Sequence, residues 1–135
     1  MIDISDLERI AGVEYSDIVK DIIRSEYKLR LILINRGFVD VNLSRRIPGR
    51  FGFHWECLGP QGSFFRYDNF PDKKCRSLPT FPCHFHNGVQ GVIEPSPFPR
   101  DIVEGFRAFL EFIRQRISDS MKKPDRETGE EKKSV

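Results

Sequence analysis

The chain has 135 residues, of which 39% are hydrophobic and 12% are aromatic, and it carries a formal net charge of +2. This length supports one domain with a single core of moderate size. No apolar run approaches the roughly 18–20 residues that cross a bilayer, and the acidic start lacks the features of a signal peptide. We therefore expect a cytoplasmic protein without a membrane anchor.

The three cysteines exclude two kinds of site. They form no C-x-x-C pair, which argues against a disulfide framework and against a four-cysteine zinc site. Free thiols are the expected state of Cys57, Cys75 and Cys83.

The charge is distributed unevenly along the chain. Residues 1–27 carry a net charge of −4 and residues 28–76 carry +6, whereas residues 77–135 are neutral overall. A basic segment can attract the phosphate backbone of a nucleic acid, although a solvated basic face explains the same pattern equally well. The middle third is therefore where a nucleic-acid surface would lie.

The first 50 residues predict a helix followed by a β-hairpin. Residues 3–11 fit a short helix capped by Asp3 or Ser5. Residues 16–26 have helical spacing, but their many β-branched side chains keep a strand open. From residue 27 apolar side chains recur at every second position, and the turn at residues 35–37 predicts a β-hairpin with one face exposed to solvent.

Residues 51–58 and 63–69 predict a second hairpin. A three-residue turn at residues 60–62 would put proline first and glycine at the left-handed position. A one-residue slip would exchange the two faces of the hairpin. The turn predicts these cross-strand pairs: Trp55 with Tyr67 and Cys57 with Phe65 on the core side, and His54 with Asp68 and Glu56 with Arg66 on the other.

The remaining chain predicts one more short strand and a helix. In an extended segment within residues 81–93, His84 and His86 would project to the same side. An apolar stripe from Ile102 to Ile117 predicts an amphipathic helix. We therefore expect a single α+β domain over residues 1–120. It would have an antiparallel sheet of four to five strands, a short N-terminal helical segment and a C-terminal amphipathic helix packed on one face. The charged residues 121–135 predict a disordered tail.

The histidines and the residues around them support three interpretations. The first is RNA cleavage without a metal, in which His84 and His86 carry protons, Arg66 steadies the phosphate and Asp68 orients His54. The expected catalytic set is thus His54, Arg66, Asp68, His84 and His86, and the expected substrate-binding set is Arg45, Arg46, Arg50 and Asn69.

The second interpretation is a site for zinc or a similar ion, built from His84, His86, His54 and Asp68. Nothing in the sequence fixes the distances, so no cofactor is assigned and a divalent metal is kept as an alternative. The third is a binding role alone, in which His54–Asp68 and Glu56–Arg66 are structural pairs worth roughly 0.2–1 kcal/mol each.

The order of three strings resembles the TumE-type toxins of prokaryotic toxin–antitoxin systems. The strings are an aromatic-flanked His54, then Arg66-Tyr67-Asp68-Asn69-x-Pro71, then Phe81-Pro82-x-His84-x-His86. The likeness covers roughly residues 27–93. It implies a small cytoplasmic toxin, a cognate antitoxin that neutralises it, and these site residues: His54, Arg66, Asp68, Asn69, Pro71, His84 and His86.

The chain departs from the family where further histidines are common. Asp72 and Lys73 follow Pro71 in place of a histidine pair, and Cys83 stands where another histidine would precede His84. This departure weakens the interpretation as a polyhistidine metal site more than the interpretation as a site of proton transfer.

Residues and resemblance together predict a toxin-like component that acts on RNA as a small ribonuclease. The alternative is a non-catalytic binding or regulatory protein whose histidines are structural or hold a metal. The expected partners are a cognate antitoxin protein and RNA, no membrane is expected, and a homodimer stays open.

Overall fold

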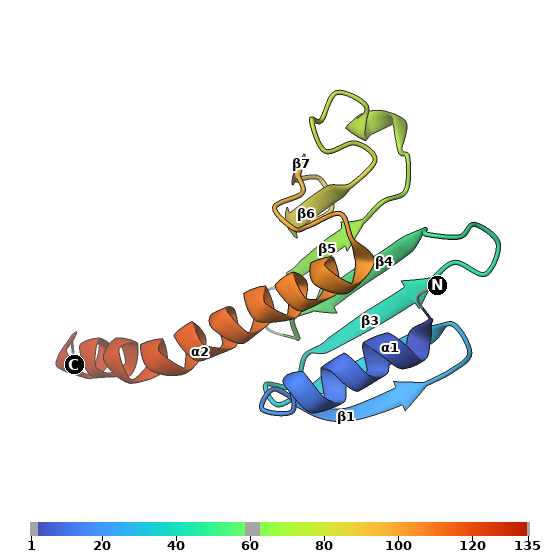
Figure 1. The fold of residues 1–135 in the computed structure, drawn as a ribbon. Coiled ribbons are helices and arrows are strands. Elements are labelled where there is room, and N and C mark those ends of the chain that lie inside the picture. The colour runs from blue at the N-terminus through green and yellow to red at the C-terminus, as the bar shows by residue number, and fades with distance from the viewer. Residues whose placement is uncertain (1–2, 59–62, 135) are drawn as a thin grey trace.

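The computed structural model describes residues 3–58 and 63–134, with side-chain surroundings up to Met121. Its centre is a seven-stranded antiparallel sheet in which every strand pairs with the next one along the chain (Figure 1). The strands are β1 (Val19–Arg24), β2 (Lys28–Leu33), β3 (Phe38–Leu43), β4 (Phe51–Glu56), β5 (Phe64–Asp68), β6 (His84–Gly88) and β7 (Ile93–Pro95). The predicted α+β class is confirmed, and the sheet has seven strands rather than four to five.

The N-terminal helix α1 (Ile4–Arg9) begins where the sequence predicts. The side chain of Asp3 accepts from the backbone amides of Ser5 and Asp6, and the carboxylate of Asp6 accepts from the amide of Asp3. This capping box satisfies amides that would otherwise lack partners at the helix start. A π-helix, η1 (Ile10–Glu14), continues from α1, and the segment after it forms β1 rather than a second helix.

The helix α2 (Ile102–Ser134) packs on the same face of the sheet as α1 and extends past the sheet edge (Figure 1). Its residues Phe106, Phe109, Leu110 and Ile113 are fully buried. In the described part of the chain, no helix is long and apolar enough to cross a membrane. The disordered tail expected from residue 121 stays a prediction.

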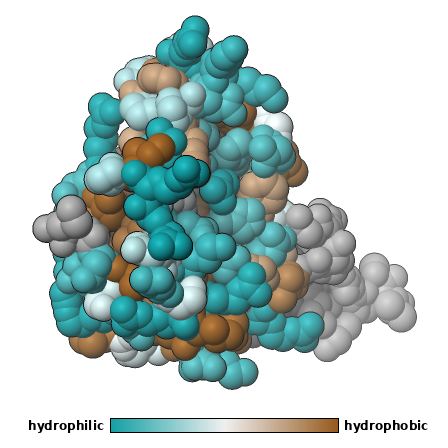
Figure 2. Space-filling model, turned by 90° about the vertical axis from the view of Figure 1, so that its right-hand side faces the viewer, coloured by the Kyte–Doolittle hydropathy of each residue, from teal (hydrophilic) through white to brown (hydrophobic). Residues whose placement is uncertain are grey.

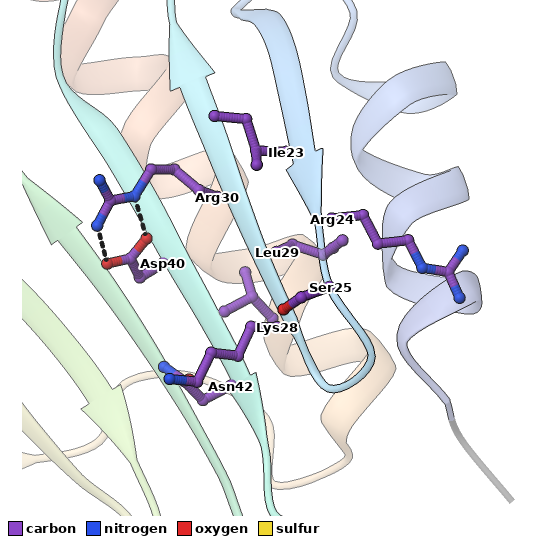
Figure 3. Close-up of a pocket in the computed structure, with 9 residues that line it drawn as sticks. Ile23, Arg24, Ser25, Lys28, Leu29, Arg30, Asp40 and Asn42 are labelled. Carbon is purple, nitrogen blue, oxygen red and sulfur yellow. Dashed lines mark hydrogen bonds and ion pairs between the residues drawn. The ribbon is translucent and has the colours of Figure 1, made fainter.

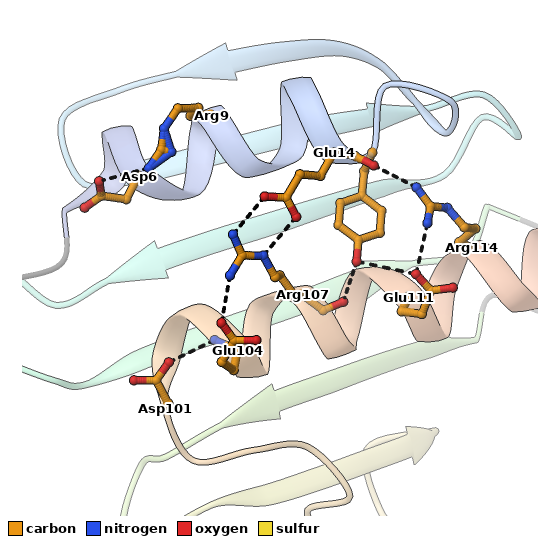
Figure 4. Close-up of polar contacts among 9 residues, drawn as sticks. Asp6, Arg9, Glu14, Asp101, Glu104, Arg107, Glu111 and Arg114 are labelled. Atoms are coloured by element: carbon orange, nitrogen blue, oxygen red, sulfur yellow. Dashed lines mark hydrogen bonds and ion pairs between the residues drawn. The ribbon is translucent and has the colours of Figure 1, made fainter.

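The acidic N-terminal segment is bound to arginines of α2 (Figure 4). Arg107 donates two bonds of 2.8 Å to the carboxylate of Glu14, and Arg114 donates to the backbone oxygen of Glu14 and to Asp17. The hydroxyl of Tyr15 donates to the backbone oxygen of Arg107 at 2.9 Å. The negative charge of residues 1–27 thus serves in part to hold α2 against the N-terminal elements.

Alternation along the strands decides which face is the core. Leu29 and Leu31 of β2, and Val39 and Val41 of β3, are buried towards the helices, as the first hairpin predicts. The turn between these strands places Arg36 at a φ of 77°. The even-numbered residues of β2 to β6 point to the other face, which neither helix covers (Figure 1).

The predicted register of the second hairpin is wrong by two residues. His54 lies opposite Arg66, Trp55 opposite Phe65, and Asp68 opposite Gly52. The predicted pairs His54–Asp68, Glu56–Arg66, Trp55–Tyr67 and Cys57–Phe65 therefore do not form. Because a shift of two residues preserves alternation, the faces were assigned correctly although the partners were not. The predicted turn at residues 60–62 lies outside the described residues.

Candidate functional site

A row of polar residues crosses five strands on the face that carries no helix. Arg30, Asp40, His54, Arg66 and His86 are successive cross-strand neighbours on β2 to β6. Directly opposed residues of an antiparallel pair have Cβ atoms roughly 4.5–5.5 Å apart. Arg66 therefore stands between two histidines, one on each neighbouring strand.

Asp68 is the hub of a buried charge network beside this row. One carboxylate oxygen accepts from Arg66 Nε at 2.7 Å, and the other accepts from the amide of Phe70 at 3.0 Å and faces His84 Nε2 at 3.2 Å. Asp68 and His84 are each 3% exposed. A buried carboxylate is costly unless it is paired and hydrogen-bonded, and the two hydrogen bonds from Arg66 and Phe70 provide most of the compensation.

His84 is held at both ring nitrogens. Nδ1 lies 3.1 Å from the backbone oxygen of Pro82, and Nε2 faces the carboxylate of Asp68. Since both ring nitrogens face acceptors of the protein itself, His84 fits a positioning neighbour of Asp68 better than it fits a general base.

His86 has the geometry of a general base. Its Nδ1 lies 3.0 Å from the backbone oxygen of Gln90, an acceptor, which places the proton on Nδ1 and leaves the lone pair on Nε2. Burial lowers the pKa of His86, and the neighbouring His84 lowers it further, while the bond to Gln90 opposes the shift. The neutral ring is therefore the form expected near pH 7.

His54 is oriented by Glu56 and not by Asp68. Its Nε2 lies 3.0 Å from a carboxylate oxygen of Glu56, and its ring stacks on Phe64 with centroids 4.8 Å apart. The side chain of His54 is 22% exposed, so it is more accessible than His86. The predicted orienting role of Asp68 towards His54 is wrong because the two residues do not share a cross-strand position.

Glu56 and Phe64 are parts of the site that the sequence interpretation missed. Phe64 contacts the rings of both His54 and His86, the second with centroids 6.4 Å apart. Alternation along the strand could have identified Phe64, because residues two apart point to the same face and Phe64 therefore shares its face with Arg66 and Asp68. Glu56 lies two residues from His54 and was assigned to Arg66 instead.

The expected substrate-binding residues separate into two groups. Arg45, Arg46 and Arg50 lie on the loop between β3 and β4, where Arg45 and Arg46 are exposed. The amide of Asn69 is already used, because its oxygen accepts from the backbone of Phe51 at 2.9 Å and its nitrogen donates to the oxygen of Gly49 at 2.8 Å. Asn69 thus ties two loops together.

Asp68, His84 and His86 also form the cluster with the strongest likeness to a metal site. One ligand atom from each residue lies within 4.8 Å of the others. However, both oxygens of Asp68 already accept hydrogen bonds, and one of these donors is the guanidinium of Arg66. A cation there would meet a neighbouring positive charge, so the donor set fits a hydrogen-bonded ion network better than a metal centre.

A pocket of about 370 Å³ opens at the other end of the polar row (Figure 3). Arg30 crosses it and binds Asp40 through two bonds of 2.7 and 2.9 Å. Lys28, Asn42 and Arg24 also line the pocket. Because Asp40 is the cross-strand neighbour of His54, the pocket and the histidines belong to one surface.

The comparisons with known proteins identify a family. The model of the toxin TumE family matches residues 4–117, which include all strands and the sheet-packed part of α2. No curated protein and no solved structure was matched. Since the match spans most of the chain and contains every residue of the polar row and of the Asp68 network, the chain belongs to the TumE toxin family.

Proposed function

We propose that this protein is the toxin of a toxin–antitoxin pair and that it cleaves RNA without a metal ion. The observation that carries the proposal is the row His54–Arg66–His86, in which a cation stands between two histidines on adjacent strands. Cleavage by the 2′-hydroxyl of RNA needs a base, an acid and a positive charge beside the phosphate. The row supplies these three groups.

The lone pair on Nε2 suits His86 to take the proton of the 2′-hydroxyl. The 2′-oxygen then forms a bond to phosphorus, the bond from phosphorus to the 5′-oxygen breaks, and His54 gives a proton to the departing oxygen. Arg66 stabilises the charge on the phosphate oxygens during this step. The products are a 2′,3′-cyclic phosphate and a 5′-hydroxyl.

Asp68 and His84 act as positioning residues in this mechanism. Asp68 holds Arg66 through the bond to Nε, and His84 holds Asp68 in turn. Neither needs to touch the RNA. The five predicted catalytic residues therefore keep a place in the mechanism, with the two proton carriers assigned to His54 and His86.

Binding without cleavage is the second candidate function. It is favoured by the burial of His86, which is 5% exposed. A toxin that only binds RNA or a component of translation would need no access to its Nε2 atom. The partner that membership of a toxin family implies is a cognate antitoxin, and it is common to both candidates.

The two candidates differ in what single substitutions do. We expect His86→Asn and His54→Asn each to lower RNA cleavage by the purified protein about 10²–10⁴-fold, the usual contribution of an acid or base. Growth arrest on expression should be lost in parallel. Lys20→Gln, an exposed residue of the edge strand β1 outside the row and the pocket, is the control and should cleave like the parent chain.

Cleavage that persists in both histidine variants would overturn the proposed mechanism. Growth arrest without detectable cleavage by the parent chain would establish the binding alternative. Thermal unfolding of each variant shows whether a loss of activity is only a loss of folding.

A further inference from the structure

Two loops at one end of the sheet form a strongly basic surface. The first, residues 44–50, joins β3 to β4, and the second, residues 69–76, follows β5. We call them the basic loop pair. Together they carry six basic side chains and one acidic one, a net charge of +5: Arg45, Arg46, Arg50, Lys73, Lys74 and Arg76, with Asp72.

These cations are accessible to a ligand. Arg45, Arg46, Lys73, Lys74 and Arg76 are exposed. Among the described residues, none of the six takes part in an ion pair. Arg30, Arg66, Arg107 and Arg114, by contrast, all bind carboxylates. Figure 2 faces this end of the molecule, and hydrophilic side chains cover much of it.

The fold fixes the two loops against each other and against the candidate site. Asn69 bonds to the backbone of Phe51 and Gly49, and the guanidinium of Arg50 lies 5.3 Å from the ring centroid of Phe70. The amide of Phe70 in turn donates to Asp68, which holds Arg66. A ligand bound across the loops would therefore continue directly onto the polar row.

We propose that the basic loop pair binds the phosphates of single-stranded RNA and leads the strand to Arg66. The inference rests on the proposed function, and it adds the class of substrate and its anchoring surface. Six cations that have no carboxylate partner among the described residues complement a phosphate backbone. Phe70 is 45% exposed beside Arg50, and an exposed ring paired with a guanidinium is a platform on which an unpaired base can stack.

The accessibility of the site also favours a single strand over a duplex. His86 is 5% exposed and the side chain of Arg66 is 26% exposed, so the reacting phosphate must reach groups that neighbouring side chains largely cover. A flexible strand can present one phosphate there, whereas a stiff A-form duplex presents its phosphates on a convex surface. Bases in a duplex are also unavailable to Phe70.

Binding can be tested apart from cleavage with an RNA that lacks free 2′-hydroxyls. The probe is a fluorescent 2′-O-methyl oligonucleotide of about 12 nucleotides, within the range of sites on single-strand-binding folds. We compare Arg45→Gln with Arg46→Gln, Lys73→Gln with Lys74→Gln, and a control that removes two charges elsewhere, Arg9→Gln with Lys20→Gln. Fluorescence anisotropy is measured over a range of salt concentrations, with thermal unfolding as the check on folding.

Each loop variant should weaken binding several-fold and reduce the salt dependence by about 0.7 in log Kd per log salt for each lost phosphate contact. The control should bind like the parent chain. Equal weakening by the control would show a general charge effect and overturn the proposal, as would unchanged binding in both loop variants. A duplex of the same sequence that binds as tightly as the single strand would overturn the assignment to single strands.

The outcomes also separate this inference from the proposed function. If the histidine variants still cleave but the loop variants lose binding, the mechanism fails and the anchoring surface stands. If the loop variants bind RNA normally but no longer bind the antitoxin, the surface belongs to the protein partner and the inference fails.

Discussion

At the residue scale, His86 combines two properties that a general base requires. The carbonyl of Gln90 fixes the tautomer, and burial lowers the pKa so that the ring stays neutral near pH 7. The same burial has a cost for folding, because the unfolded chain binds a proton at a pH where the folded chain does not.

This cost gives a prediction about stability and pH. The folded-state pKa of His86 lies below the unfolded value of 6.5, so its effect on stability is absent well above that value. As the pH falls through about 6.5, the unfolded state gains a proton first and the free energy of unfolding decreases, by at most about 1.4 kcal/mol per pH unit. Chemical denaturation between about pH 7.5 and pH 5.5 should show a smaller decrease for His86→Gln than for the parent chain. An equal decrease in both proteins would contradict the assignment.

Gly52 is the second residue whose environment is specific to the site. It lies opposite Asp68, and a Cβ atom at this position would come within 2.7 Å of Nη2 of Arg66. The guanidinium therefore occupies the space that the glycine leaves open.

We expect Gly52→Ala to fold but to displace Arg66. The clash is with the end of a flexible side chain, and alanine lowers the entropy of the unfolded chain by the equivalent of about 0.4–1 kcal/mol, so the change in unfolding free energy should stay small. RNA cleavage should fall about tenfold or more, because small misplacements of a catalytic group are costly. Gly91→Ala, with nothing within 4 Å of its Cβ position, is the matched control. Full activity in Gly52→Ala would argue against the position assigned to Arg66.

At the scale of elements, the alternation of apolar and polar residues predicted on which face of the sheet a side chain lies better than it predicted the cross-strand partner of that residue. The apolar period of β2 and β3 and the turn at residues 35–37 fixed the first hairpin, because a short turn leaves one register. In the second hairpin, any loop that preserves alternation keeps Trp55 inside and His54 outside. In the observed register β4 also pairs with β3 and β5 with β6, and the pattern of a single hairpin does not contain these neighbours.

The strands that the sequence did not predict clearly are those whose own residues show little of the alternation typical of a strand. β7 has three residues and ends at Pro95, and β1 is an edge strand with an irregular register between Val19 and Asp21. Both become strands through pairing with a neighbour rather than through their own pattern. Prediction of the site was limited in the same way. The spacing of two predicts that His84 and His86 share a face, but their position beside Arg66 and Asp68 depends on the pairing of β5 with β6.

At the scale of the whole molecule, charge and burial distinguish the two faces of the sheet. The helices cover one face, and the acidic N-terminal segment binds α2 through Arg107 and Arg114 (Figure 4). The other face carries the polar row, and the basic loop pair lies at its end. The uneven charge of the sequence thus corresponds to two separate regions, an acidic segment that binds α2 and a basic pair of loops.

The mechanism that we propose for the row His54–Arg66–His86 is cleavage of RNA through the 2′-hydroxyl and without a metal. The most direct measurement follows the cleavage of an RNA oligonucleotide by the purified parent chain in excess chelator and identifies the ends of the products. If this mechanism operates, cleavage is undiminished, the products carry 2′,3′-cyclic phosphate and 5′-hydroxyl ends, and the 2′-O-methyl form of the same sequence is not cleaved. Cleavage that the chelator abolishes, or that proceeds on the 2′-O-methyl form, would contradict it.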